Sequence, residues 1–223
     1  MKKILVIKHG SLGDITFALD AMFAIRKKYL NSLIYLLTEK KYISFLTKTK
    51  IFDKIIVDNR KNFIFISFLN LLNLLKENFD IVIDLQNSQR TLLYNLIIRL
   101  FNKSLICSSR PFAHLRYKIP IQGQESARIG LSNQLKMLNI NVDHSANYDW
   151  LKVTIKDEIT KSIILIIPGV SKGNEYKKWQ PEKFADVAEF CESKNFTICI
   201  VGTKSDLISA KKIILKCKNV LNK

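Results

Sequence analysis

The chain has 223 residues, of which 48% are hydrophobic; this suits one large or two smaller globular domains and excludes intrinsic disorder. Its 36 lysines and arginines against 19 acidic residues give a formal net charge of +17, which calls for an anionic partner such as nucleic acid, phosphorylated substrate or acidic lipid. The four cysteines do not have the spacing of a metal site or a disulfide framework, so we expect a cytoplasmic protein with reduced thiols. The longest apolar stretch, residues 63–75, is too short to span a membrane, so we expect the protein to be soluble or to bind at a membrane surface.

A short strand and a turn that carries a carboxylate open the chain. Residues 4–7 (ILVI) are typical of a buried strand, and the turn GSLGD at residues 10–14 leads into a helical pattern that runs to residue 28. Asp14 then lies at the carboxyl end of a parallel strand, where open α/β sheets bind ligands. The turn lacks the features of a dinucleotide fingerprint or a P-loop. Asp14 is therefore interpreted either as a general base or as the cap of a helix that begins at Ile15.

Strand and helix patterns alternate through the next eighty residues. Strands are predicted over residues 32–38, 54–58, 79–86 and 103–108, and helices over residues 42–46, 65–76 and 88–101. This order is typical of a parallel, doubly wound sheet. The inward face of the helix over 88–101 is predicted to hold Leu92, Leu93, Leu96, Ile97 and Leu100.

The pattern breaks at residues 109–121, which contain two prolines and several basic residues and are predicted to form a loop at the sheet edge. Residues 126–138 predict another helix. Residues 139–161 are polar and without periodicity, so we interpret them as the crossing between two domains.

A second strand and helix system begins at residue 163. The strand over 163–167 runs into a loop with glycines, a serine and lysines, and a helix opens at Pro181. Such a loop favours an anion site, although the lysines could instead be solvated and Trp179 could pack on the following helix. One more strand, over 196–201, and a helix to Lys216 follow. Two strands leave a sheet edge unfilled, so the sequence predicts a truncated two-domain protein.

Three of these segments together resemble glycosyltransferase family 9, the ADP-heptose:lipopolysaccharide heptosyltransferases. Residues 4–14 resemble the family's strand and Ser-Leu-Gly-Asp turn, residues 79–90 its Asp-Leu-Gln-x-x-x-Arg strand and helix, and residues 168–184 its donor-phosphate loop. The resemblance implies the GT-B type of α/β fold, with two Rossmann-like doubly wound domains, the second one incomplete. The expected parts are an acceptor-side domain over 1–145, a linker over 146–162 and a partial nucleotide-sugar-binding domain over 163–223.

The resemblance also implies inverting sugar transfer with neither metal nor cofactor. By position, Asp14 would be the general base, Ser171, Lys172 and Lys177 would hold the donor diphosphate, and Asp206 would lie near the nucleotide ribose. The acceptor side is assigned to these residues: Ser11, Gln86, Arg90, Arg110, His114, Arg116 and Lys118.

The expected function is transfer of heptose or a related sugar from an ADP-sugar donor to the lipopolysaccharide inner core, on lipid A, at the cytoplasmic face of the inner membrane. The family's later Asp-Ser/Thr-Gly-x-x-His segment has no counterpart before Lys223. The alternative is therefore a non-catalytic remnant that binds anionic glycolipid or a partner subunit. A nucleic-acid partner would rest on charge alone and is not predicted.

Overall fold

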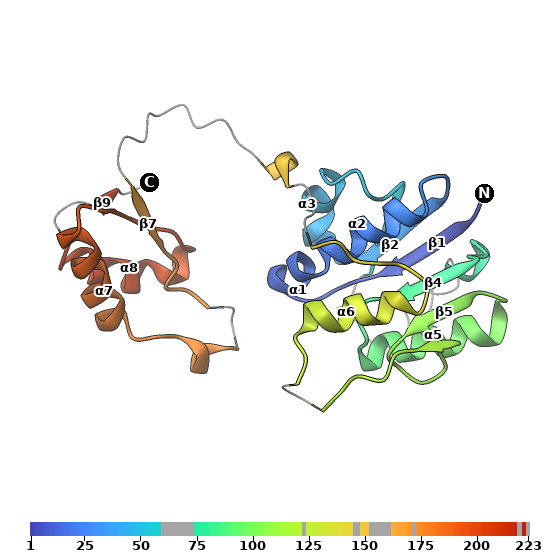
Figure 1. Cartoon of the computed structure of the whole chain (residues 1–223). Coiled ribbons are helices and arrows are strands. Elements are labelled where there is room, and N and C mark those ends of the chain that lie inside the picture. The colour runs from blue at the N-terminus through green and yellow to red at the C-terminus, as the bar shows by residue number, and fades with distance from the viewer. Residues whose placement is uncertain are drawn as a thin grey trace. The chain divides into compact units, whose positions relative to one another are not determined.

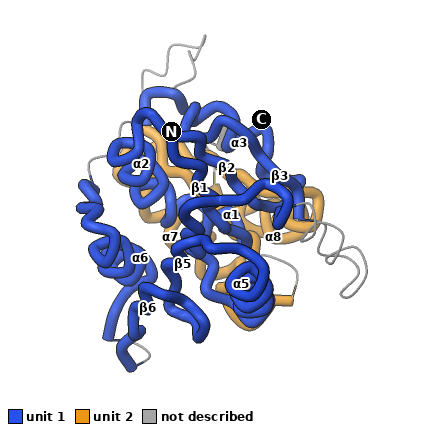
Figure 2. Tube along the Cα trace, turned by 90° about the vertical axis from the view of Figure 1, so that its right-hand side faces the viewer, with its two compact units in different colours: residues 1–152 blue, residues 153–223 orange. Residues whose placement is uncertain are grey.

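The described residues form two parallel sheets, one in the unit Met1–Lys152 (unit 1) and one in the unit Val153–Lys223 (unit 2) (Figures 1 and 2). The computed structural model describes residues 1–58, 74–121, 124–144, 148–151, 162–170, 173–217 and 220–221.

Within the described residues of unit 1, the sheet has six parallel strands in the order β3-β2-β1-β4-β5-β6. Their bounds are β1 Lys3–Ile7, β2 Leu33–Thr38, β3 Lys54–Val57, β4 Ile81–Asp84, β5 Leu105–Ser108 and β6 Leu115–Arg116. The first five confirm the predicted strands, whereas β6 forms inside the segment predicted to be a loop. The strand order reverses between β1 and β4, and a doubly wound sheet opens a ligand crevice outside the carboxyl ends of such strands.

Helices contribute to both faces of this sheet (Figure 1). Alternate residues of β1 point to opposite sides: Ile4 and Val6 pack with α1, α2, α3 and α6, and Leu5 and Ile7 pack with α5. The described helices of unit 1 are α1 Leu12–Phe17, α2 Leu19–Lys28, η1 Lys40–Tyr42, α3 Ile43–Thr47, α5 Gln89–Phe101, α6 Ala127–Lys136 and η2 Asp149–Leu151. Residues 74–76 are helical, and the rest of the helix predicted over 65–76 lies outside the described residues.

The predicted inward face of α5 is correct only in part: Leu92, Leu96 and Ile97 are half-buried, and Ile97 packs against the core. Leu93 and Leu100 are 49% and 68% exposed, and the residues that the helix buries are instead Thr91, Tyr94, Asn95 and Ile98. Polar side chains turn inward because buried carboxylates need hydrogen-bond donors there. The Tyr94 hydroxyl donates to Asp58 Oδ2 at 2.8 Å, and Asn95 Nδ2 donates to Asp84 Oδ2 at 3.0 Å.

Asp58 lies at the centre of a buried ion network directly after β3. Arg90 on α5 binds both of its oxygens, at 2.6 and 3.0 Å, and His9 Nε2 lies 3.3 Å from Oδ2. Burial would raise the pKa of Asp58, but the hydrogen bonds from His9, Arg90 and Tyr94 together hold this pKa well below its ordinary value. The network therefore ties the carboxyl ends of β1 and β3 to α5.

A second buried carboxylate, Asp20 on α2, accepts hydrogen bonds from α6 and from Tyr148 within unit 1. Arg128 Nε donates to it at 2.8 Å and the Tyr148 hydroxyl at 2.6 Å. Burial and the contact with Asp20 raise the pKa of Tyr148 to about 12, so Tyr148 keeps its proton as a donor. Trp150 packs on Phe45. The described part of the predicted linker, residues 148–151, is thus packed on unit 1; most of the rest lies outside the described residues.

Unit 2 contains three parallel strands in the order β7-β8-β9: β7 Ile163–Ile166, β8 Thr197–Ile200 and β9 Val220–Leu221. The helices are η3 Glu175–Lys177, α7 Pro181–Ser193, η4 Lys204–Asp206 and α8 Leu207–Ile214. Ile166 and Ile198 of the sheet pack against Ala188 of α7 and Ile213 of α8. Strands β7 and β8 and both α-helices confirm the predicted elements of this region. The prediction of two strands was incomplete, because β9 pairs with β8 as a third strand.

We expect Asp58→Ala to lower the free energy of unfolding of unit 1 by about 3–5 kcal/mol, because it removes the carboxylate that compensates the buried charge of Arg90. Urea denaturation measures the change. Glu77→Ala is the matched control, since Glu77 pairs with Lys3 and Lys54 at a more exposed site and should cost no more than about 1 kcal/mol. Equal losses in the two variants would contradict the assignment.

The same variant tests a pH dependence. Because the pKa of Asp58 is lower in the folded than in the unfolded chain, its stabilisation is complete above about pH 4 and is lost progressively as the pH falls below that value. The difference in unfolding free energy between wild type and Asp58→Ala should therefore shrink by about 1.4 kcal/mol per pH unit below about pH 4. A difference independent of pH would contradict this.

Candidate functional site

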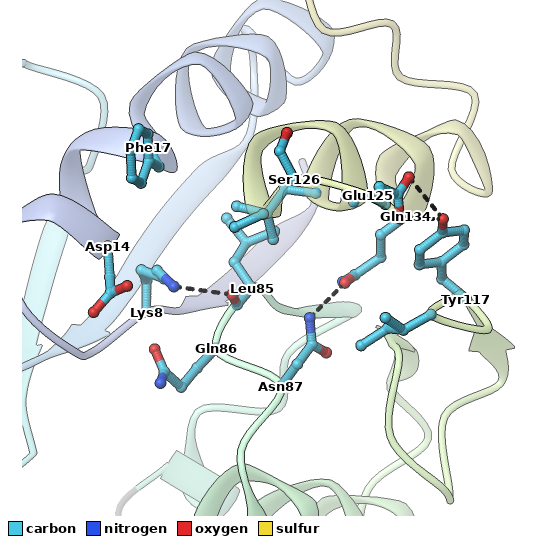
Figure 3. Close-up of a pocket in the computed structure, with 14 residues that line it drawn as sticks. Lys8, Asp14, Phe17, Leu85, Gln86, Asn87, Tyr117, Glu125, Ser126 and Gln134 are labelled. Atoms are coloured by element: carbon cyan, nitrogen blue, oxygen red, sulfur yellow. Dashed lines mark hydrogen bonds between the residues drawn. The ribbon is translucent and has the colours of Figure 1, made fainter. Parts of the chain in front are cut away.

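A pocket of about 280 Å³ lies in unit 1 beside the carboxyl ends of β1 and β4 (Figure 3). It is where the reversal of strand order predicts a ligand site. Its lining comes from the residues after β1, from α1, from the turn after β4, from the segment after β6 and from α6. These residues are Lys8, Asp14, Phe17, Leu85, Gln86, Asn87, Tyr117, Ile119, Glu125, Ser126, Ala127, Gly130, Leu131 and Gln134.

Asp14 is held in the wall of this pocket by a reciprocal helix cap. Ser11 is the N-cap of α1, and its hydroxyl accepts a hydrogen bond from the Asp14 backbone N–H at 3.3 Å. In return, Asp14 Oδ2 accepts from the Ser11 backbone N–H at 2.7 Å and from its hydroxyl at 2.8 Å. The helix therefore begins at Leu12 and not at Ile15, and Ser11 is its cap. Asp14 belongs to the cap and lines the pocket at once, so the two interpretations are compatible.

Because Gly10 has no side chain, it leaves room for the Asp14 carboxylate. Gly10 has a φ of +113°, and a Cβ on it would lie 2.6 Å from Asp14 Oδ2. The backbone of this residue is held from both sides: its N–H donates to Glu39 Oε1 at 3.2 Å, and its carbonyl accepts from the Tyr42 hydroxyl at 2.8 Å. The turn is thus pinned to the segment that follows β2.

Lys8 forms part of the pocket although sequence reasoning did not select it. It follows β1 directly, is only 7% exposed, and donates from Nζ to the Leu85 carbonyl at 3.3 Å (Figure 3). Burial lowers the pKa of Lys8, and the negative charges of Asp14 and Asp84 act in the opposite direction. The only signal in the sequence was a lysine at the end of an apolar strand.

The turn after β4 is rigid because the buried Asp84 organises it. Asp84 Oδ1 accepts from the backbone N–H groups of Gln86 and Asn87, both at 3.0 Å. Asn87 has a φ of +52°, and its Nδ2 donates to Gln134 Oε1 of α6 at 2.8 Å. Gln86 Oε1 accepts from the His9 backbone N–H at 3.0 Å. Gln86, a predicted acceptor residue, thus lines the pocket, as do the unpredicted Asn87 and Gln134.

The remaining wall combines polar and apolar groups. The Tyr117 hydroxyl donates to Glu125 Oε2 at 2.7 Å, while Phe17 and Ile119 are 57% and 62% exposed although both line the pocket. Carboxylate, amide and hydroxyl groups beside an aromatic ring offer hydrogen bonds and a flat apolar surface together, which suits a polyhydroxylated ligand.

Six of the seven predicted acceptor residues are not among those that line the pocket; one of the six, Ser11, is the N-cap of α1. The guanidinium of Arg90 is committed to Asp58, and Arg110 Nε donates to the Asn87 carbonyl at 2.6 Å, where it supports the turn after β4. His114 Nδ1 accepts from the Ile106 backbone N–H at 3.1 Å, and Arg116 is exposed on β6. Lys118, exposed as well, is also absent from the lining but lies between the lining residues Tyr117 and Ile119.

In unit 2, Ser171 and Lys172 lie outside the described residues, so only two of the predicted donor residues are placed. Lys177 is exposed at the end of η3, with Nζ 5.4 Å from the centre of the Tyr176 ring. Asp206 is 8% exposed; the Thr203 backbone N–H and hydroxyl donate to Oδ2, both at 2.8 Å, and lower its pKa. The Trp179 ring packs on Phe184 of α7, which confirms the structural interpretation of Trp179.

The chain matches the sequence model of one known protein family. Residues 69–223 match the model of glycosyltransferase family 9 (heptosyltransferase). No curated protein matches the chain by sequence.

Solved structures match nearly the whole chain. A glycosyltransferase family 9 protein from Veillonella parvula is 21% identical, with a TM-score of 0.69 over 98% of this chain and 68% of that one. The Escherichia coli heptosyltransferase WaaC with ADP-2-deoxy-2-fluoro heptose is 16% identical, with a TM-score of 0.71 over 99% and 76%. The E. coli ADP-heptose lipopolysaccharide heptosyltransferase II is 13% identical, with a TM-score of 0.64 over 97% and 69%. These similarities show a shared fold, the predicted GT-B type.

Two glycines of the turn before Asp14 provide a matched test. Gly10→Ala should displace the carboxylate and lower the free energy of unfolding by about 1–3 kcal/mol, because its backbone conformation and the 2.6 Å contact both oppose a side chain. Gly13→Ala lies in α1, meets only Ser11 Oγ at 3.7 Å, and should stabilise the helix by up to about 1 kcal/mol. Urea denaturation and crystal structures of both variants measure these effects. A tolerated Gly10→Ala with Asp14 in place would contradict the prediction.

Proposed function

Because the chain belongs to glycosyltransferase family 9, the heptosyltransferases, we propose that it transfers heptose or a related sugar from a nucleoside-diphosphate donor to the inner core of lipopolysaccharide. The observation that carries the proposal is the place of Asp14 in unit 1. Its carboxylate lines a pocket at the carboxyl edge of the sheet and is oriented there by two hydrogen bonds from Ser11.

In the proposed mechanism Asp14 is the general base of an inverting transfer. The acceptor hydroxyl attacks the anomeric carbon of the donor sugar, its proton passes to the carboxylate, and the bond from that carbon to the diphosphate breaks as ADP leaves. The two hydrogen bonds from Ser11 to Oδ2 orient this carboxylate in the pocket. The orientation of the carboxylate is then set before substrate arrives, so little reorganisation is needed during the reaction.

The donor site is proposed to lie in unit 2. E. coli WaaC has been solved with ADP and with ADP-2-deoxy-2-fluoro heptose, which supports an ADP-sugar as donor for this family member. Lys177, with Ser171 and Lys172 of the same loop, would hold the diphosphate and offset the charge that builds on it as the bond breaks. Asp206 would lie near the ribose. The mechanism assigned to these residues requires no metal or cofactor.

The acceptor and the membrane are proposed from charge. Lipid A and the inner leaflet are rich in phosphate, and a net charge of +17 favours binding at such a surface. Arg110, His114, Arg116 and Lys118 follow β5 in one segment of unit 1 and are the proposed contacts to acceptor phosphates. Among the described residues, none of the helices is both long and apolar enough to cross a bilayer. We therefore propose peripheral association with the cytoplasmic face of the inner membrane.

Asp14→Asn tests the base. The amide keeps the shape of the side chain but cannot accept the proton, so kcat for sugar transfer should fall by about 100-fold or more while the fold and ADP binding persist. Ser11→Ala is the matched control: it removes one hydrogen bond to the carboxylate and leaves the base, so we expect a loss of about tenfold at most. The assay measures ADP release and product mass with a lipopolysaccharide core acceptor. An Asp14→Asn variant with more than a tenth of wild-type kcat would contradict the mechanism.

Lys177→Ala tests the donor site. Loss of a charged contact to the diphosphate should weaken ADP binding about tenfold or more, as measured by isothermal titration calorimetry. Lys194→Ala is the control, because Lys194 follows the carboxyl end of α7 and precedes β8, on the opposite edge of the sheet from the proposed phosphate loop. If both variants bind ADP as the wild type does, Lys177 does not hold the donor.

A further inference from the structure

The segment 116–121, here called the docking loop, combines exposed basic and exposed apolar side chains. Arg116, the last residue of β6, and Lys118 are both exposed. Ile119 and Ile121 follow, 62% and 77% exposed, on either side of an exposed proline. Apolar side chains scattered singly over a surface are normal, whereas those gathered in one place mark a contact surface. The loop is therefore a candidate contact surface.

The base of the docking loop is anchored to the rest of unit 1. The Tyr117 backbone N–H donates to the Ser108 carbonyl of β5 at 3.0 Å, and the Tyr117 hydroxyl donates to Glu125 Oε2 at 2.7 Å. Glu125 also accepts from Asn133 of α6. The exposed isoleucines thus follow directly after a residue that is held in place from two sides.

The docking loop lies at the mouth of the pocket, and that mouth is apolar. Tyr117 and Ile119 of the loop line the pocket, and Phe17 of α1 lines it on the side opposite Tyr117 (Figure 3). Phe17 is 57% exposed, whereas Gln134, which offers an amide to the same pocket, is 1% exposed. A polar pocket with an exposed apolar rim suits a polar group attached to an apolar surface, because the group enters the pocket while the rim contacts that surface.

We propose that the docking loop inserts into a membrane: Ile119 and Ile121 enter the interfacial region of an anionic bilayer, and Arg116 and Lys118 face its headgroup phosphates. The pocket then opens at the membrane surface, where a lipid-anchored acceptor presents its sugar. The use of this contact in sugar transfer rests on the proposed function. The contact itself involves no reaction and can be measured on vesicles that contain no acceptor.

Charge favours a bilayer over a protein as the partner of the docking loop. Arg116 and Lys118 are both cations, in a chain with a net charge of +17, and each lysine or arginine near an anionic leaflet strengthens binding. Lysine is depleted from protein–protein interfaces, whereas its apolar stem and charged head suit the boundary between hydrocarbon and headgroups. A second copy of the chain would bring the same positive charge to the loop. Isoleucines preceded by cations therefore fit an anionic lipid surface.

The test is co-sedimentation of the full chain with vesicles of phosphatidylcholine and phosphatidylglycerol that contain no lipopolysaccharide. Ile121→Ser should lower the partition coefficient about fivefold or more, because the variant loses an apolar group that enters the bilayer. Leu30→Ser is the matched control, since Leu30 is 71% exposed between α2 and β2, at the opposite edge of the sheet from the pocket. It should change the coefficient by less than about twofold.

The basic residues are tested on the same vesicles. Arg116→Gln combined with Lys118→Gln should lower the partition coefficient about tenfold, because two cations near the headgroups are lost. Lys27→Gln combined with Lys28→Gln removes the same charge at the end of α2 and should lower it about twofold at most. Equal losses in the two double variants would overturn the assignment of the bilayer contact to the docking loop.

Fluorescence separates insertion from adsorption by charge alone. On vesicles whose lipids are brominated in the acyl chains, the added tryptophan of Ile121→Trp should be quenched, compared with wild type, which contains Trp150 and Trp179. The added tryptophan of Leu30→Trp should not be quenched. Quenching that is equal in the two variants would overturn insertion through the loop.

Other occupants of the docking loop give different results. Binding that requires lipid A in the vesicles would overturn the inference, because the loop would then contact the acceptor and not the bilayer. A wild-type dimer that Ile121→Ser dissociates in analytical ultracentrifugation without vesicles would overturn it in favour of a second copy. Vesicle binding that depends on Ile121, in a protein without sugar transfer, would support membrane docking and contradict the proposed function.

Discussion

A buried carboxylate has to be hydrogen-bonded, and this requirement shapes the carboxyl edge of the sheet in unit 1. Asp58, directly after β3, accepts hydrogen bonds from Arg90 and Tyr94 of α5. Asp84, at the end of β4, accepts hydrogen bonds from Asn95 of α5 and from the backbone N–H groups of the following turn. The two acids together set the rotation of α5 and the shape of the turn. The pocket is positioned by these polar contacts as much as by the apolar core beneath it.

Both units contain the same capping box with an acidic residue at its end. In unit 1 the sequence Gly-Ser-x-x-Asp ends at Asp14, and in unit 2 Gly-Thr-x-x-Asp ends at Asp206, with the acid in each case accepting from the N-cap backbone and hydroxyl. In each, the glycine lacks the Cβ that would crowd the acid. A capping box alone therefore does not identify a base. The residue two before the glycine differs: it is Ile200 in unit 2, and in unit 1 it is Lys8, which lines the same pocket as Asp14.

Sequence reasoning missed the parts of the site that depend on contacts between residues far apart in the sequence. Gln134 on α6 reaches Asn87 and the Asp84 carbonyl, about fifty residues earlier in the chain. The predicted leucine face of α5 was wrong at Leu93 and Leu100 for the same reason. Periodicity ranks side chains by hydrophobicity and has no information on the carboxylates after β3 and in β4 to which the helix donates hydrogen bonds. Arg90, predicted from the family pattern to face an acceptor, is bound to Asp58 instead.

The sequence by itself determined the alternation of strands and helices, the parallel doubly wound class, the family, and the position of Asp14 after the first strand. These follow from local periodicity, turn residues and short motifs, which act over a few neighbouring residues. Only the tertiary structure decided that Ser11 caps α1, that α5 turns polar side chains inward, and that the buried Lys8 lines the same pocket as Asp14. Those outcomes depend on which distant groups a fold brings into a low-dielectric interior, where each charge and each hydrogen-bonding group requires a partner.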